Sequence, residues 1–189
     1  MRIITGKAKG KALLSLEGDL TRPTSQRIKE AIFSAIQFDV ENRRTLDLFA
    51  GSGQMGLEAL SRGASHAHFI DISREAIEIA KKNAARTGLL DSSKFLVSDW
   101  RNYIRKAAGK EKFDLVFVDP PYSMACCREA ARKLLESGIL ALGAIVVLES
   151  GEEDIEPESL SGYEVLKSTH YGKKTFVNIL LFRGDGGEK

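Results

Sequence analysis

The sequence predicts an α/β domain built on a largely parallel β-sheet. Strand-like and helix-like hydrophobic periodicities alternate along the chain, a pattern typical of repeated strand–helix–strand units. A glycine-rich segment joins one predicted strand directly to a helix, as a tight strand-to-helix turn requires. The length of 189 residues suffices for one domain with a well-buried core. The predicted strands cover residues 45–49, 66–71, 94–97, 113–119 and 144–149.

Two of the intervening helices can be bounded from the sequence. Ser73 can cap the first, and Gly88 can end it in the left-handed conformation. The second is expected to run from about residue 123 to Gly138. Helical spacing places Ala76, Ile77, Ala80 and Ala84 on one face of the first helix, and turns Ala130, Ala131, Leu134 and Leu135 of the second inward.

The two ends of the sequence depart from this alternation. At the front, β-like stretches at 3–5 and 12–16 precede Pro23 and a helix carrying Ile28, Ile32, Ala35 and Ile36. At the back, residues 162–170 and 175–182 flank Tyr171, Gly172 and Lys173, which predicts a hairpin. We expect one domain over 1–183, with an N-terminal extension at 1–40 and a core at 41–183, an acidic surface loop at 151–159 and a frayed tail at 184–189.

The composition is that of a soluble globular protein, with 43% hydrophobic and 29% charged residues. The net charge of +2 is small, but the first thirty residues hold a local basic excess. This excess suits a phosphate backbone, although a solvated charged face would look the same. Its cations are Arg2, Lys7, Lys9, Lys11, Arg22, Arg27 and Lys29, against Glu17, Asp19 and Glu30.

The sequence shows neither a secretory signal nor an apolar run long enough to span a membrane, so we expect a cytoplasmic protein. The adjacent cysteines, Cys126 and Cys127, are expected to be reduced helix residues, because neighbours rarely bridge and they lack the spacing of a zinc site. The histidines also lack metal-ligand spacing. We therefore expect no metal.

A glycine-rich loop and a downstream carboxylate predict an adenosine-type ligand. Gly51, Gly53 and Gly56 match the fingerprint G-x-G-x-x-G between a strand and a helix. Asp71 ends the next predicted strand, where a carboxylate can accept hydrogen bonds from ribose hydroxyls. Both a nicotinamide dinucleotide and S-adenosylmethionine contain adenosine, so this pattern alone leaves the two open.

The charge of the predicted strand ends favours a cationic ligand over a pyrophosphate. Four carboxylates, Asp47, Asp71, Asp99 and Asp119, lie in or directly after predicted strands. A sulfonium cation fits this ring of carboxylates better than a dinucleotide. Other roles stay open: Asp47 can tie down the glycine loop through backbone amides, and Asp99 with Trp100 can be a helix cap and a core tryptophan instead of a binding site for adenine.

The fourth predicted strand ends in Asp119-Pro120-Pro121-Tyr122. Consecutive prolines fix the backbone and remove amide donors, so this segment is rich in acceptors. A nucleobase amino group is a poor nucleophile until acceptors hold its hydrogens and its nitrogen becomes pyramidal. Asp119 and the Pro120 carbonyl can act in this way while Tyr122 stacks on the base. The alternative is a rigid turn without chemistry.

In this order, the motif LDLFAGSG, an acidic strand end and DPPY resemble class I amino-methyltransferases. Further segments resemble the bacterial RsmD-type family over nearly the whole chain, namely RIITGKAKGKAL, RPTSQRIKEAIF, VLES and YGKKTFVNILLF. That resemblance implies transfer of a methyl group from S-adenosylmethionine to the N2 amino group of a guanine in 16S ribosomal RNA. It also implies a substrate within a small ribosomal subunit or an assembly intermediate, and we expect a monomer that does not bind membranes.

The resemblance further implies a Rossmann-like class I methyltransferase fold with a seven-stranded, mostly parallel sheet. Its strand order is 3-2-1-4-5-7-6, strand 7 is antiparallel, and the N-terminal extension contacts RNA. The implied cofactor residues are Arg22, Thr24, Asp47, Phe49, Gly51, Gly53, Asp71, Ile72, Asp99 and Trp100; the catalytic ones are Asp119, Pro120, Pro121 and Tyr122; and the substrate contacts are Arg2, Lys7, Lys9, Lys11, Arg27, Glu149 and Lys173.

The sequence departs from the family pattern in two places, namely Ser25-Gln26 after the RPT segment and Trp100 after Asp99. Both can alter how the adenine and the N-terminal helix pack. A carboxylate at position 119 can pair with both N2 and N1 of guanine, which adenine does not allow. Three alternatives remain: an adenine-N6 DNA methyltransferase, a nicotinamide-dependent oxidoreductase, and a noncatalytic RNA-binding or assembly factor.

Overall fold

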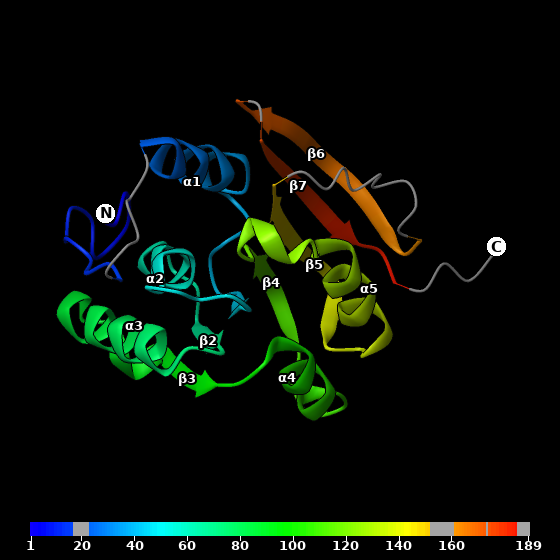
Figure 1. Ribbon diagram of the computed structural model, residues 1–189, viewed down its shortest axis with the longest axis horizontal. Helices are drawn as coiled ribbons and strands as arrows, with labels where there is room; N and C mark the ends of the chain where they lie inside the picture. Colours follow the sequence, from blue (N-terminus) through cyan, green and yellow to red (C-terminus); the bar gives the residue numbers. More distant parts are fainter. Residues whose placement is uncertain (17–22, 152–160, 173, 185–189) are drawn as a thin grey trace. The chain divides into compact units, whose positions relative to one another are not determined.

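The computed structural model describes residues 1–16, 23–151, 161–172 and 174–184. Its seven strands form one sheet in the order β3-β2-β1-β4-β5-β7-β6 (Figure 1). The chain divides into two compact units, Met1–Trp100 and Arg101–Lys189. The predicted α/β class and the predicted strand order are confirmed.

The first unit holds three parallel strands and three α-helices. β2 pairs in parallel with β1 on one side and with β3 on the other. Helix α2 packs on β1 and β2, and α3 packs on β2 and β3. The elements are α1 (Pro23–Ala35), β1 (Arg44–Asp47), α2 (Gln54–Ser61), β2 (His66–Asp71), α3 (Arg74–Thr87), the 3-10 helix η1 (Leu90–Ser92) and β3 (Ser93–Val97).

Helix α3 begins and ends where its caps predict. The Ser73 side chain accepts a hydrogen bond from the Ala76 amide at 3.2 Å. Gly88 ends the helix at φ 74°, in the left-handed region. The four residues expected to share a face, Ala76, Ile77, Ala80 and Ala84, are all buried.

The second unit holds the remaining four strands. β4 and β5 are parallel, with Val118 opposite Leu148, whereas β7 runs antiparallel to both β5 and β6. The predicted C-terminal hairpin is confirmed, with Tyr171 ending its first strand. The elements are α4 (Trp100–Ala107), β4 (Phe113–Val118), the 3-10 helix η2 (Tyr122–Met124), α5 (Cys127–Glu136), β5 (Leu140–Ser150), β6 (Tyr163–Tyr171) and β7 (Thr175–Phe182).

The predicted helix start at about residue 123 is too early. A single 3-10 turn occupies Tyr122–Met124, and Ala125 adopts φ 41° and ψ 48°, in the left-handed region. A left-handed residue interrupts helical hydrogen bonding, so α5 begins only at Cys127. Gly138 ends this segment at φ 64°, as expected. Leu135 is half-buried, whereas Ala130, Ala131 and Leu134 are fully buried.

The front of the chain folds as a compact loop with one antiparallel bridge, Arg2 to Ala12, where two β-like stretches were expected. Figure 1 shows this segment beside α2 and α3. Its hydrogen bonds go mainly to those helices, which explains why no longer ladder forms. The acidic stretch 152–160 and the tail 185–189 lie outside the described residues. Among the residues that the structure describes, no helix combines the length and apolarity needed to cross a bilayer.

Candidate active site

The glycine-rich loop follows β1 and is closed by its own backbone. The Gly53 amide donates to the Ala50 carbonyl at 2.7 Å, and Gly53 caps α2 at φ 82°. Gly51 lies at φ 50°. Side-chain-bearing residues rarely adopt such positive φ values, which explains why glycines occupy these two positions. The predicted strand to residue 49 ends two residues earlier, because Leu48 and Phe49 already belong to this turn.

Asp71 at the end of β2 holds the loop in place. One carboxylate oxygen accepts the Gly51 amide at 2.9 Å, and the other accepts the Ser73 amide at 2.8 Å. Each carboxylate oxygen can accept more than one hydrogen bond, so capacity for ribose hydroxyls remains. Asp71 therefore joins the glycine loop to the start of α3, a role that its position in the sequence did not reveal.

Asp47 holds the loop from its other side. Its side chain is 1% exposed and accepts the Gly56 amide at 3.0 Å. Burial raises the pKa of Asp47 to about 7, and the nearby Asp71 charge adds to the rise, while hydrogen bonds from the Gly56 and Phe49 amides oppose it. The structure thus shows the loop-tying role that the sequence left as one of two options for Asp47.

The glycines of the fingerprint differ in what surrounds them. A Cβ on Gly56 would stand 2.4 Å from the Phe69 ring, so this glycine lets α2 pack closely on β2. A Cβ on Gly51 would have no described atom within 4 Å. The open space beside Gly51 is where a ligand can approach the backbone.

Gln54 is a candidate ligand contact that the sequence did not single out. It is the first residue of α2, directly after the glycine loop. Within the described part of the chain, its buried Oε1 atom has no hydrogen-bond partner. A buried acceptor without a donor is costly, and a bound ligand is one way to satisfy it. Only the structure could reveal this, because a single glutamine carries no sequence signal.

The residues expected to surround an adenine differ in exposure. Ile72, which follows β2, is 74% exposed and offers an apolar surface. Trp100 is only 3% exposed, and its ring centroid lies 6.0 Å from that of Phe49. The tryptophan therefore packs in the core beside Phe49. Asp99 is half-buried and directly precedes α4, as in the helix-cap option that the sequence left open for it.

The predicted catalytic motif lies at the exit of β4. The strand ends at Val118, so Asp119 is the first residue beyond it and is half-buried. The Pro121 carbonyl accepts the Met124 amide at 2.8 Å, which closes the turn η2. Because Val118 lies opposite Leu148, Asp119 and Glu149 follow at the same edge of the sheet. β5 continues to Ser150, and the Glu149 carbonyl accepts the Cys127 thiol at 3.3 Å.

The N-terminal basic excess is smaller in the structure than in the sequence. Lys29 is 2% exposed, pairs with Glu58 at 3.2 Å and donates to the Arg2 carbonyl at 3.0 Å. Burial lowers the pKa of Lys29, and Glu58 opposes that shift. Lys29 therefore offers no free charge to a partner. The remaining expected contacts of this segment, Arg2, Lys7, Lys9, Lys11 and Arg27, are exposed, and the Lys11 ammonium donates to the Thr87 carbonyl at 2.9 Å.

Some predicted site residues cannot be placed. Arg22 and Lys173 lie outside the described residues, and the side chains of Thr24 and Tyr122 are likewise not described. Among the residues that the structure describes, no group of three or more histidine, cysteine or acidic side chains could hold a metal ion. Both cysteines are buried, and neither forms a disulfide.

Comparison with known proteins identifies the family. The model of the family described as "Conserved hypothetical protein 95" matches residues 1–179. The chain belongs to this family. Its members include relatives of the RsmD type, so the resemblance predicted from the sequence is confirmed.

Three relatives illustrate the extent of the match. "Putative rRNA methyltransferase YlbH" of Bacillus subtilis is 35% identical over 97% of this chain and 100% of its own length. "Ribosomal RNA small subunit methyltransferase D" of Haemophilus influenzae is 30% identical over 84% of each chain. The solved structure "Putative methyltransferase yhhF from Escherichia coli" is 29% identical, with a TM-score of 0.86 over 97% of this chain and 98% of that chain. The family is therefore shared over nearly the full length of the chain.

Proposed function

We propose that this family member is an S-adenosylmethionine-dependent ribosomal RNA methyltransferase that modifies the N2 amino group of a guanine in 16S RNA of the small subunit. The observation that carries the proposal is the Asp119–Tyr122 motif at the exit of β4, the fourth of seven strands in the sheet. Relatives named as ribosomal RNA methyltransferases support the reaction class and the substrate class.

The residues of the glycine loop fit S-adenosylmethionine. Gly51 faces open space, the buried Oε1 of Gln54 has no donor among the described residues, and Asp71 places a carboxylate at the end of β2. When bound, this cofactor supplies a methyl group on a positively charged sulfur. Asp71 would accept from the ribose hydroxyls, Ile72 would lie against the adenine, and Asp47 would keep the loop in its binding conformation.

At the exit of β4, Asp119 acts on the base. Its carboxylate would accept from N2 and N1 of guanine in a charge-assisted pair, and the Pro120 carbonyl would accept the second N2 hydrogen. These acceptors localise the nitrogen lone pair toward the methyl group. When the methyl group is transferred to N2, Asp119 or water would accept the surplus proton of that nitrogen. Tyr122 would stack on the base.

Incorporation of labelled methyl from S-adenosylmethionine tests the proposal. We expect incorporation into unmethylated small subunits or 16S RNA, none into duplex DNA, and mapping of the label to guanine N2. Asp119→Ala should abolish transfer while the affinity for S-adenosylhomocysteine changes by no more than severalfold. The matched control is Asp114→Ala, which removes a carboxylate from the same strand at a distance from its exit. Label on adenine, or equal loss of transfer and cofactor affinity in Asp119→Ala, would contradict the assignment.

A further inference from the structure

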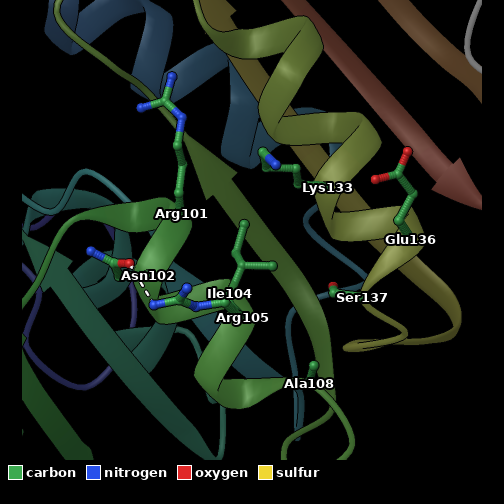
Figure 2. Close-up of a pocket in the computed structure, with 8 residues that line it drawn as sticks. All are labelled: Arg101, Asn102, Ile104, Arg105, Ala108, Lys133, Glu136 and Ser137. Carbon is green, nitrogen blue, oxygen red and sulfur yellow. Dashed lines mark hydrogen bonds between the residues drawn. The ribbon is translucent and has the colours of Figure 1, made fainter.

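A groove lies between α4 and α5 in the second unit, with a volume of about 440 Å³ (Figure 2). Its polar lining consists of Arg101, Asn102, Arg105, Lys133, Glu136 and Ser137. We call it the α4–α5 groove. Three of these six side chains are cations and one is an anion. Its remaining lining residues, Ile104 and Ala108, are aliphatic, so the lining offers no ring on which a base could stack.

The two helices that form the groove are, like the first thirty residues, a basic part of a nearly neutral chain. Together they carry six cations and two carboxylates, a net charge of +4, whereas the whole chain has +2. The remainder of the chain is therefore net negative. A charge concentrated on two neighbouring helices is a local feature of the kind that phosphate backbones recognise.

The ion pairs in the groove do not neutralise its cations. Glu129 accepts two hydrogen bonds from one edge of the Arg101 guanidinium, from Nε at 2.9 Å and from Nη2 at 2.6 Å, and also lies 3.9 Å from the Lys133 ammonium. One carboxylate thus serves two cations. Arg105 donates at 3.1 Å to the Asn102 amide oxygen, which is neutral, and Figure 2 shows this contact along α4. Lys133 and Arg105 therefore keep positive charge that a phosphate can satisfy.

The groove is also connected along the chain to the predicted catalytic motif. The motif ends at Tyr122, where η2 begins, and α5 follows three residues after η2 ends. Arg128 and Glu129 are thus among the first residues of the helix that leaves the motif. The α5 residues that line the groove, Lys133, Glu136 and Ser137, lie in the last turn of that helix and at its C-cap, so a nucleic acid whose base reached Asp119 would have to extend along α5 to bring more distant phosphates to the groove.

We propose that the α4–α5 groove binds the sugar–phosphate backbone of the RNA substrate, with Arg105 and Lys133 contacting phosphate oxygens away from the target base. The inference rests on the proposed function, which supplies the RNA. Such contacts set the register of the RNA and carry no sequence information. Arg101 takes a supporting part, because Glu129 already holds its guanidinium.

The test is the salt dependence of binding to 16S RNA transcribed in vitro. The variant Arg105→Gln/Lys133→Gln removes both contacts, and Lys106→Gln/Lys110→Gln is the matched control, which removes two exposed cations outside the groove lining. We expect the groove variant to lower the slope of log K against log salt by about 1.4, from about 0.7 per lost contact. The control should change it by less than half as much. Thermal unfolding and affinity for S-adenosylhomocysteine should match the wild type in both variants.

Two outcomes would overturn the proposal that the α4–α5 groove binds RNA, and both can be distinguished from failure of the proposed function. An unchanged slope in the groove variant means that no phosphate is bound there. Equal losses in both variants mean that only diffuse charge attracts the RNA. In either case the wild type still transfers labelled methyl to the RNA. If the wild type neither binds nor methylates 16S RNA, the proposed function falls and this inference falls with it.

Discussion

The carboxylates of Asp47 and Asp71, at the strand ends, are already used by the protein itself. Asp47 and Asp71 each accept backbone amides from the glycine loop or its flanks, so the loop is held from two sides before any ligand arrives. Preorganised groups of this kind reduce the cost of ordering on binding. The sequence left holding the loop as one option for Asp47 and did not suggest that role for Asp71, and it could not show how the oxygens of either residue are already used.

The raised pKa of Asp47 gives a test of its burial. The pKa is about 7 in the folded protein and 3.8 without the fold, so the folded state keeps a proton that the unfolded chain has lost. The stabilisation from this proton is complete below about pH 4 and is lost as the pH rises to 7. Relative to Asp47→Asn, the wild-type free energy of unfolding should therefore fall by up to about 1.4 kcal/mol per pH unit in that window.

Urea unfolding of both proteins at pH 5, 6, 7 and 8 measures this difference. The other titrating groups are common to the two proteins, so their contributions largely cancel in the difference between the two free energies of unfolding. Parallel pH profiles would show that Asp47 titrates normally in the folded protein. The difference should level off above pH 7, because the carboxylate is then ionised in both states.

One side chain of α3 links the N-terminal segment to the glycine loop. Asn83 is fully buried and exchanges two hydrogen bonds with Leu14, at 2.8 and 3.0 Å. The same amide donates to the Ser52 carbonyl in the glycine loop at 2.9 Å. Leu14 and Ser52, which are remote in sequence, are thus hydrogen-bonded to the same side-chain amide. No local pattern in the sequence predicts this link.

Asn83→Ala should lower the free energy of unfolding by roughly 2–4 kcal/mol, because it removes three hydrogen bonds made by a buried side chain, one of them to the buried Ser52 carbonyl. Asn102→Ala, on an exposed position of α4, should cost less than about 0.5 kcal/mol. Hydrogen exchange gives the more specific measurement, since the Leu14 amide should lose protection in the first variant only. Retained protection at Leu14 would show that the segment is held by its other contacts with α2.

Elements with clear periodicity or caps could be predicted closely from the sequence. β2 and β7 have the predicted bounds, and α3 has both predicted caps, because alternation, Ser73 and Gly88 act locally. The misses have non-local causes. α4 is mostly polar and gives little apolar signal, and α5 begins late because Ala125 takes a left-handed conformation that alanine seldom favours. The contact of Trp100 with Phe49 is also non-local, so the sequence left a core position for Trp100 as one of two options.

At the scale of the whole molecule, a ligand that binds the folded state alone raises the stability of the entire chain by mass action. This separates the two adenosine ligands that the glycine loop allows, because only one of them should bind. At one hundred times its dissociation constant, S-adenosylhomocysteine should add about 2.7 kcal/mol. For a chain of this size, the gain corresponds to a rise in melting temperature of roughly 5–10 °C. NAD at equal concentration should give no rise.

Asp71→Ala should reduce that rise in melting temperature, because Asp71 both holds Gly51 and is the predicted acceptor for the ribose. Asp91→Ala, on the exposed 3-10 helix η1, provides the control with the same loss of charge and should keep the full rise. A larger shift with NAD than with S-adenosylhomocysteine would favour an oxidoreductase. Asp71 contacts the predicted cofactor site through the Gly51 amide, in the loop between β1 and α2. Equal rises in melting temperature with S-adenosylhomocysteine in Asp71→Ala and Asp91→Ala would therefore place the cofactor away from this loop.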